Sequence, residues 1–122
     1  MVRRALNLEG AKIPKSDWSR AVLNNARFSR TDLTRANLTR ANLDNANMQM
    51  AILRSAVLVD ACLVGTDLRG ADLTGADFLG ANLDQADLRG ADLSDAKNLT
   101  HEQLAQALVD ETTKLSGNFS RV

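Results

Sequence analysis

This sequence is poor in cysteine and in long apolar runs, and both scarcities exclude classes of protein. Cys62 is the only cysteine, which excludes an internal disulfide framework and a zinc site built from several cysteines. The longest apolar runs are too short to span a bilayer, and the opening residues MVRRALNLEG lack the apolar segment of a secretory signal. We therefore expect a soluble, cytoplasmic protein that packing and hydrogen bonds stabilise.

A surplus of either charge is also missing, because 15 Lys and Arg balance 15 Asp and Glu. The two halves differ nevertheless: residues 1–60 contain 10 basic and 5 acidic side chains, whereas residues 61–122 contain 5 and 10, which gives +5 and −5. The total charge therefore indicates no particular partner, but the molecule is electrically polar. With 122 residues and 44% hydrophobic content, the chain is expected to form one folded domain.

What the sequence has in abundance is a repeat of five residues. Every fifth residue from Leu8 to Leu93 is large and apolar, 18 in succession. The position two before it is alanine in 14 of the 18 repeats, and the position between them is Asp or Asn in 12. On an α-helix the leucines would spiral around the axis, and on a flat strand they would alternate between faces. A chain that bends once per pentapeptide brings all of them into one axial core.

Glycine and proline mark the place of the bend. Six of the seven glycines stand two positions after the central apolar residue, where a type II turn requires a positive φ. Pro14 stands one position after its central residue, where its fixed φ fits the turn. In the N-terminal half we expect a different turn type, because arginine often takes the glycine position there: Arg20, Arg30, Arg35 and Arg40.

The A-(D/N)-L-x-x motif of residues 6 to 97 resembles the pentapeptide repeat family of bacteria and cyanobacteria. This resemblance implies an all-β solenoid, a right-handed quadrilateral β-helix with four pentapeptides per coil, so that residues twenty apart stack. Residues 1–97 would then form about four and a half coils. Residues 98–122 would form a short C-terminal capping α-helix and a tail.

The capping helix has its own sequence signals. Thr100 and Gln103 have the spacing of a capping box, and Leu104, Ala107 and Leu108 have the spacing of an apolar stripe. They predict a helix from about residue 101 to residue 112 that lies over the last coil. No comparable cap precedes residue 6, so the N-terminal end of the rod is expected to be open, covered by residues 1–5, or paired with another chain.

No group of residues indicates an enzyme, a cofactor or a metal site. His101 falls in the first turn of the predicted helix without a serine or cysteine partner, and Cys62 points outward without a base beside it. Asp67 and Asp87 should stack, but arginines two residues further on can neutralise them. Bonds from such carboxylates to arginine and to local backbone explain them better than a metal does. We predict no catalytic residues, no cofactor and no metal.

The stretch MQMAILRSAVLVDACLV, residues 48–64, interrupts the polar exterior. Other coils fill the equivalent outward positions with Asp, Asn, Thr and Ser. Contiguous apolar patches mark contact sites, although β-branched residues also simply suit an extended backbone. We favour a contact site, and its candidate residues are Met50, Ile52, Val57, Val59, Val64 and Leu79.

Basic residues form the second surface feature. With coils stacked every twenty residues, Lys15 and Arg35 line one edge of the rod, and Arg20 and Arg40 line another. Such columns suit phosphates or an acidic protein, whereas the simpler interpretation, which we favour, is ordinary solvated surface.

These observations predict a non-enzymatic protein–protein interaction or scaffold module that binds a partner through flat faces. The resemblance offers an alternative, because some relatives imitate duplex DNA and bind type II topoisomerases such as gyrase; here the acidic C-terminal half would do so. Direct nucleic-acid binding is disfavoured, because Trp18, Phe28 and Phe78 are expected inside. Self-association is expected through the uncapped N-terminal end or through the face of Val57, Val59 and Leu79.

Overall fold

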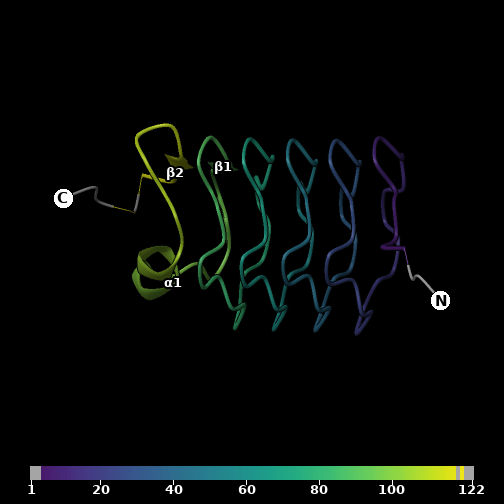
Figure 1. Cartoon of the computed structure of the whole chain (residues 1–122). Coiled ribbons are helices and arrows are strands. Elements are labelled where there is room, and N and C mark those ends of the chain that lie inside the picture. Colours follow the sequence, from purple (N-terminus) through teal and green to yellow (C-terminus); the bar gives the residue numbers. More distant parts are fainter. Residues whose placement is uncertain (1–3, 118, 120–122) are drawn as a thin grey trace.

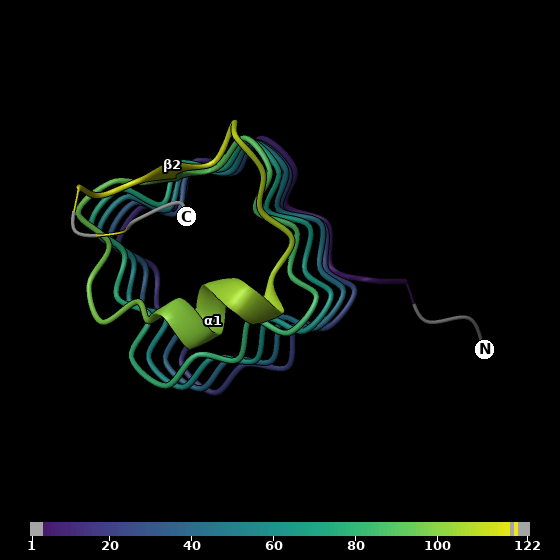
Figure 2. The same cartoon turned by 90° about the vertical axis from the view of Figure 1, so that its left-hand side faces the viewer.

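The computed structural model describes residues 4–117 and 119 and shows a rod of stacked coils (Figure 1). Parallel bridges join residues twenty positions apart, from Asn7 with Arg27 up to Asp77 with Lys97. Four pentapeptides therefore make one coil. Seen along the axis, the coils superpose into a four-sided outline (Figure 2).

Each side of this outline is a flat face that runs the length of the rod. The residue before each central leucine points outward from a face and pairs with its equivalent in the next coil. We number the faces in the order in which the chain visits them. The first carries Asn7, Arg27, Asn47, Asp67 and Asp87; the second Lys12, Asp32, Ile52, Asp72 and Asp92; the third Asp17, Asn37, Val57, Asp77 and Lys97; and the fourth Val22, Asn42, Cys62 and Asn82.

The corners between faces are hydrogen-bonded turns with a left-handed third residue. In one of them the Ala36 N–H donates to the Leu33 carbonyl at 2.9 Å, and Arg35 has a φ of 60°. Gly70, with a φ of 67°, stands at the same place in its own turn. The prediction of a different turn for the arginine repeats is wrong, because the arginines adopt the glycine conformation: Arg20, Arg30, Arg35 and Arg40 have φ of 62°, 58°, 60° and 58°.

Stacking between coils imposes this conformation regardless of the side chain. The Arg35 N–H donates to the Arg54 carbonyl of the next coil at 2.8 Å, just as the Gly70 N–H donates to the Arg89 carbonyl at 3.1 Å. A left-handed residue with a Cβ costs about 1–2 kcal/mol. The hydrogen bond and the buried leucine beside each corner offset that cost.

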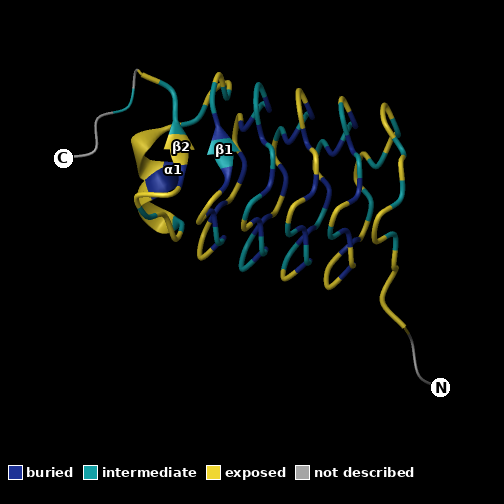
Figure 3. Ribbon diagram, turned by 90° about the horizontal axis from the view of Figure 1, so that it is seen from above, coloured by how far each residue is buried: buried dark blue, intermediate teal, exposed yellow. Residues whose placement is uncertain are grey.

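The leucine column forms the core. All 15 central residues from Leu23 to Leu93 are buried, whereas Leu8, Ile13 and Trp18 of the first coil are only half-buried. Buried segments recur along the coils that follow the first (Figure 3). Phe28 is completely buried, as predicted, and the Trp18 ring meets its ring edge-on with centroids 5.9 Å apart.

The Asp and Asn column has a local structural cause. The Asn37 Oδ1 accepts a hydrogen bond from the Thr39 N–H at 3.0 Å, and the Asp77 Oδ1 accepts one from the Leu79 N–H at 3.1 Å. All 12 Asp and Asn at this position make the same bond to the residue two further on. The repeat therefore selects Asp or Asn because they satisfy a backbone donor that points to solvent.

A short helix and a returning strand close the C-terminal end. After β1 (Asp92–Leu93) the chain forms α1 (His101–Gln106) and β2 (Lys114–Leu115), and β2 pairs in parallel with β1. The predicted capping box is present: Thr100 accepts from the Gln103 N–H, and the Gln103 side chain accepts from the Thr100 N–H. None of the helices in the described residues has the length and hydropathy to cross a membrane.

The helix ends at Gln106 instead of near residue 112, so its predicted extent is wrong. The chain leaves the helix because the coil below offers better backbone partners than a short helix does. The Leu108 N–H donates to the Ala86 carbonyl, and the Leu88 N–H donates to the Leu108 carbonyl, both at 2.8 Å. Of the predicted apolar stripe, only Leu104 is buried; Leu108 lies beyond the helix and is 52% exposed.

Candidate functional site

The candidate interface residues are distributed over several faces. Val57, Val59 and Leu79 lie together on the third face, where the column of Val57 continues to Asp77 and the Asp60 N–H beside Val59 bonds to the Leu79 carbonyl. We call these three residues the third-face patch. The other candidates do not share that face: Ile52 is on the second, Val64 follows Cys62 on the fourth, and Met50 stands at the corner between the first and second.

Leu79 is the most exposed member of the third-face patch. It is 53% exposed, whereas Val57 and Val59 are half-buried. Met50 is 51% exposed, but its sulfur lies over the backbone of Gly70, in the space that a Cβ at that position would need. Among the six candidate interface residues, Leu79 therefore exposes the most apolar surface.

The two basic columns border the same face. Lys15 and Arg35 stand at the corner before the third face, and Arg20 and Arg40 stand at the corner after it. All four are exposed. Arg40 has Asp60 above it, with Nε and Oδ2 3.9 Å apart. Basic side chains thus flank the third face in the first two coils, and the apolar patch follows in the next two.

Three acidic residues of the C-terminal half, Asp67, Asp72 and Asp87, form ion pairs with arginine. On the first face the Arg69 guanidinium lies 2.8 Å from Asp67 and 3.8 Å from Asp87, and the Arg89 guanidinium lies 2.6 Å from Asp87. The hydrogen bonds from these arginine side chains are the largest cause that lowers the pKa of Asp67 and of Asp87. The described residues contain no group of three or more His, Cys, Asp and Glu that could hold a metal.

The two candidate reactive side chains lie apart from each other. Cys62 is exposed on the fourth face. His101 is exposed at the start of α1, where its ring lies 5.0 Å from the Phe119 ring. The structure does not bring either of them to the third-face patch.

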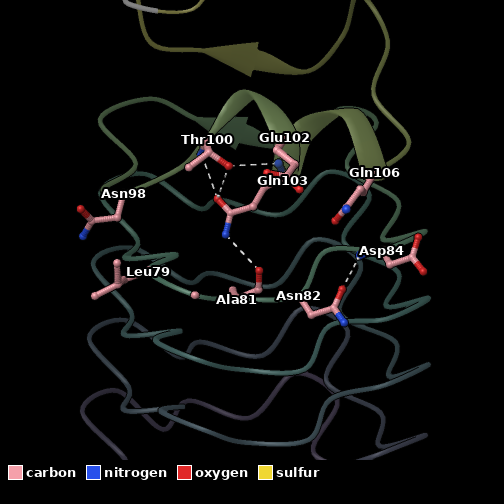
Figure 4. Close-up of a pocket in the computed structure, with 10 residues that line it drawn as sticks. Leu79, Ala81, Asn82, Asp84, Asn98, Thr100, Glu102, Gln103 and Gln106 are labelled. Atoms are coloured by element: carbon pink, nitrogen blue, oxygen red, sulfur yellow. Dashed lines mark hydrogen bonds between the residues drawn. The ribbon is translucent and has the colours of Figure 1, made fainter.

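An open groove beside α1 was not predicted from the sequence. It has a volume of ≈ 580 Å³, and its lining includes Leu79, Asn82, Asp84, Asn98 and Gln106 (Figure 4). No local motif signals the groove, because its lining joins residues 79–84 with residues 98–106. Since Leu79 belongs to both, the groove continues the third-face patch toward the C-terminal end.

Comparison with protein families decides what kind of protein this is. The family model for pentapeptide repeats matches residues 5–40, 36–75 and 61–97, with 8 copies. The chain belongs to the pentapeptide repeat family. The resemblance inferred from the motif is thereby confirmed, and a right-handed β-helix is implied, on a scaffold that generally carries no catalysis. No curated protein sequence matches the chain.

Solved pentapeptide repeat proteins share this architecture. Rfr23 from the cyanobacterium Cyanothece 51142 is 27% identical, with a TM-score of 0.52 over 90% of this chain and 88% of its own. The protein alr5209 from Nostoc Pcc 7120 is 26% identical, with a TM-score of 0.56 over 88% of this chain and 100% of its own. QnrB1, a plasmid-mediated fluoroquinolone resistance protein, is 15% identical with a TM-score of 0.35 over 93% of this chain and 92% of its own, too distant to inform function.

Proposed function

We propose that this pentapeptide repeat protein is a non-enzymatic protein–protein interaction or scaffold module that binds its partner through the third face. The repeats of residues 1–97 would carry the binding, and residues 98–122 would cover the end of the rod. The observation that carries the proposal is the third-face patch: Val57 lies in the column of the third face, Val59 and Leu79 lie in the turns at its edge, and Leu79 is 53% exposed. A rigid, preformed face loses little conformational entropy when it binds.

Val57 supports the proposal through the hydrogen bond that it lacks. Asn37 and Asp77, its neighbours in the same column, each accept from the backbone N–H two residues further on. Valine has no acceptor, so the repeat loses a bond that contributes about 1 kcal/mol elsewhere. Departures from a local rule without a structural gain are typical of functional positions.

The charges around the patch indicate the chemistry of the partner. The corners at Lys15 and Arg35 and at Arg20 and Arg40 place basic groups on both sides of the third face. A partner that fits would present apolar side chains opposite Val59 and Leu79 and acidic groups toward the N-terminal coils. Met50, Ile52 and Val64 lie on other faces and would contact only a partner that wraps around a corner.

The test introduces a charge at two residues of the patch, the half-buried Val59 and the exposed Leu79. We expect the double variant Val59→Lys/Leu79→Lys to lose a partner that the unaltered protein retains from an extract of its native cells, because two ammonium groups would have to be desolvated. The matched control, Ser29→Lys/Gln49→Lys, alters the same slots on the first face. Equal retention by the protein and both variants would refute binding through the third face.

The alternative of a DNA mimic that binds gyrase has less support. Such a mimic needs a continuous anionic surface, but on the first face Arg69 and Arg89 stand beside Asp67 and Asp87. On the second face Arg54 pairs with Asp72. The acidic C-terminal half is therefore interrupted by guanidinium groups where the mimicry would require an uninterrupted row of negative charge.

A further inference from the structure

The first coil has an unpaired backbone edge on all four faces. In a later coil the residue before the central leucine turns both of its backbone groups toward the preceding coil: the Asp32 N–H donates to the Ala11 carbonyl at 2.8 Å, and the Asp32 carbonyl accepts from the Ile13 N–H at 2.9 Å. The equivalent residues of the first coil make no such backbone bonds within the described chain; they are Asn7, Lys12, Asp17 and Val22.

Apolar side chains are exposed at the same end. Val22 is 79% exposed and Leu6 is 41% exposed, and both line a hollow of ≈ 420 Å³. Three of the four central residues of this coil, Leu8, Ile13 and Trp18, are only half-buried, because no layer covers them. The first described residues leave the rod sideways instead of crossing its end (Figure 2).

The opposite end of the rod is closed. The Gln103 side-chain amide donates to the Phe78 and Ala81 carbonyls at 2.8 and 3.0 Å. β2 pairs with β1, and the chain at Leu108 pairs with Asp87. In the described residues, a helix and a partial layer thus cover the last coil, whereas nothing comparable covers the first.

We propose that two copies of this chain join head to head through their first coils. A residue that offers both its N–H and its carbonyl on one side forms the hydrogen-bonded pair of an antiparallel ladder. When a two-fold axis perpendicular to the rod relates two copies, the facing coils run antiparallel. The unpaired N–H and carbonyl groups lie on all four faces, so only another four-sided coil of the same size can pair with all of them at once. A second copy of this chain has such a coil.

The geometry limits this assembly to two copies. A two-fold interface uses the same surface on both chains, so nothing remains open for a third. The contact also covers Val22 and the half-buried Trp18 of both copies. The basic halves meet, however, since residues 1–60 carry a net +5. Salt screens that repulsion, so the dimer should become tighter as the ionic strength rises.

Sedimentation equilibrium tests the proposal on the full chain. We expect a mass of twice 13.2 kDa for the unaltered protein. Val22→Lys places a charge in the edge and should raise the dimer dissociation constant by about tenfold or more. The control Cys62→Lys alters the same column two coils away and should leave the dimer intact. Val22→Pro removes an N–H that has no backbone partner among the described residues, and it should also give monomers.

Three results would overturn the proposal. They are a monomer at every concentration, species larger than a dimer, and a Val22→Lys variant that dimerises as well as Cys62→Lys does. Circular dichroism shows whether each variant remains folded. The double variant Val59→Lys/Leu79→Lys distinguishes dimerisation through the first coil from binding through the third face. It alters only the third-face patch, so it should dimerise normally. If that variant alone becomes monomeric, the copies associate through the third-face patch instead.

Discussion

Val57 lacks the side-chain hydrogen bond of its repeat position and presents an apolar side chain instead. Every Asp and Asn in its slot satisfies a backbone N–H, and Val57 does not. We predict that Val57→Asn raises the free energy of unfolding by about 0.5–1.5 kcal/mol, because the Asn oxygen accepts from the Val59 N–H. The same change should weaken binding through the third-face patch, because it replaces an apolar side chain there. Urea unfolding and partner retention measure the two effects.

The control for this change is Val59→Asn. Residue 59 follows the central leucine, as Asp44 does, and Asp44 accepts from the Val64 N–H of the next coil, where Cys62 offers no acceptor. Above residue 59 the equivalent Leu79 N–H already donates to Asp77, so we expect no gain in stability there. If Val57→Asn leaves the stability unchanged or lowers it, the hydrogen bond does not explain the Asp and Asn column. If it stabilises the protein and binding is also retained, Val57 is not part of the interface.

At the scale of elements, α1 depends on one side chain. A helix of six residues is marginal by itself. In the coils below, an alanine carbonyl accepts from the N–H of the next coil, as Ala61 does from Asn82. Above the last coil the Gln103 amide takes that place and donates to the Phe78 and Ala81 carbonyls. The Gln103 side chain thus replaces the backbone donor that a further coil would supply.

We therefore predict that Gln103→Glu lowers the free energy of unfolding by about 1–3 kcal/mol. The carboxylate cannot donate, so the Ala81 carbonyl loses the Gln103 N–H, the Phe78 carbonyl keeps only the Ala81 N–H, and both face a negative charge. Glu102→Gln, the exposed neighbouring position, is the control and should change little. Thermal unfolding of both variants provides the measurement. Equal melting temperatures for the two variants would show that Gln103 does not anchor α1.

The elements that could be predicted from the sequence are those with local causes. The five-residue period places each leucine in the core, and the capping box at Thr100 and Gln103 is a contact between close neighbours. The end of α1 at Gln106 and the left-handed conformation of Arg35 could not be predicted in this way. Both depend on backbone partners in another coil, about twenty residues away in the chain.

At the scale of the whole molecule, the period of twenty places residues on faces. It puts Val57, Val59 and Leu79 together and separates them from Ile52, although residues 52 and 57 are near in sequence. The groove beside α1 and the exposure of the first coil could not be predicted from that period, because they depend on how the two ends of the rod are closed.

The carboxylates make the stability of the whole rod depend on pH. Hydrogen bonds from Ser and Thr side chains lower the pKa of Asp17, Asp32 and Asp92, and arginine side chains lower the pKa of Asp67 and Asp87. In the unfolded chain these groups titrate near their ordinary pKa of 3.8. The unfolded state therefore binds more protons than the folded state in the interval just below that value.

It follows that the free energy of unfolding is highest above the ordinary pKa of 3.8 and falls as the pH decreases through the lower folded values. Urea midpoints from neutral pH to about pH 3 should show this decline. Asp87→Asn keeps an acceptor for the Arg89 N–H but has no proton to bind, so its decline should be shallower. Asp84→Asn, whose carboxyl accepts no hydrogen bond in the described structure, is the matched control. A midpoint that stays constant down to about pH 3 would show that the carboxylate bonds do not stabilise the rod.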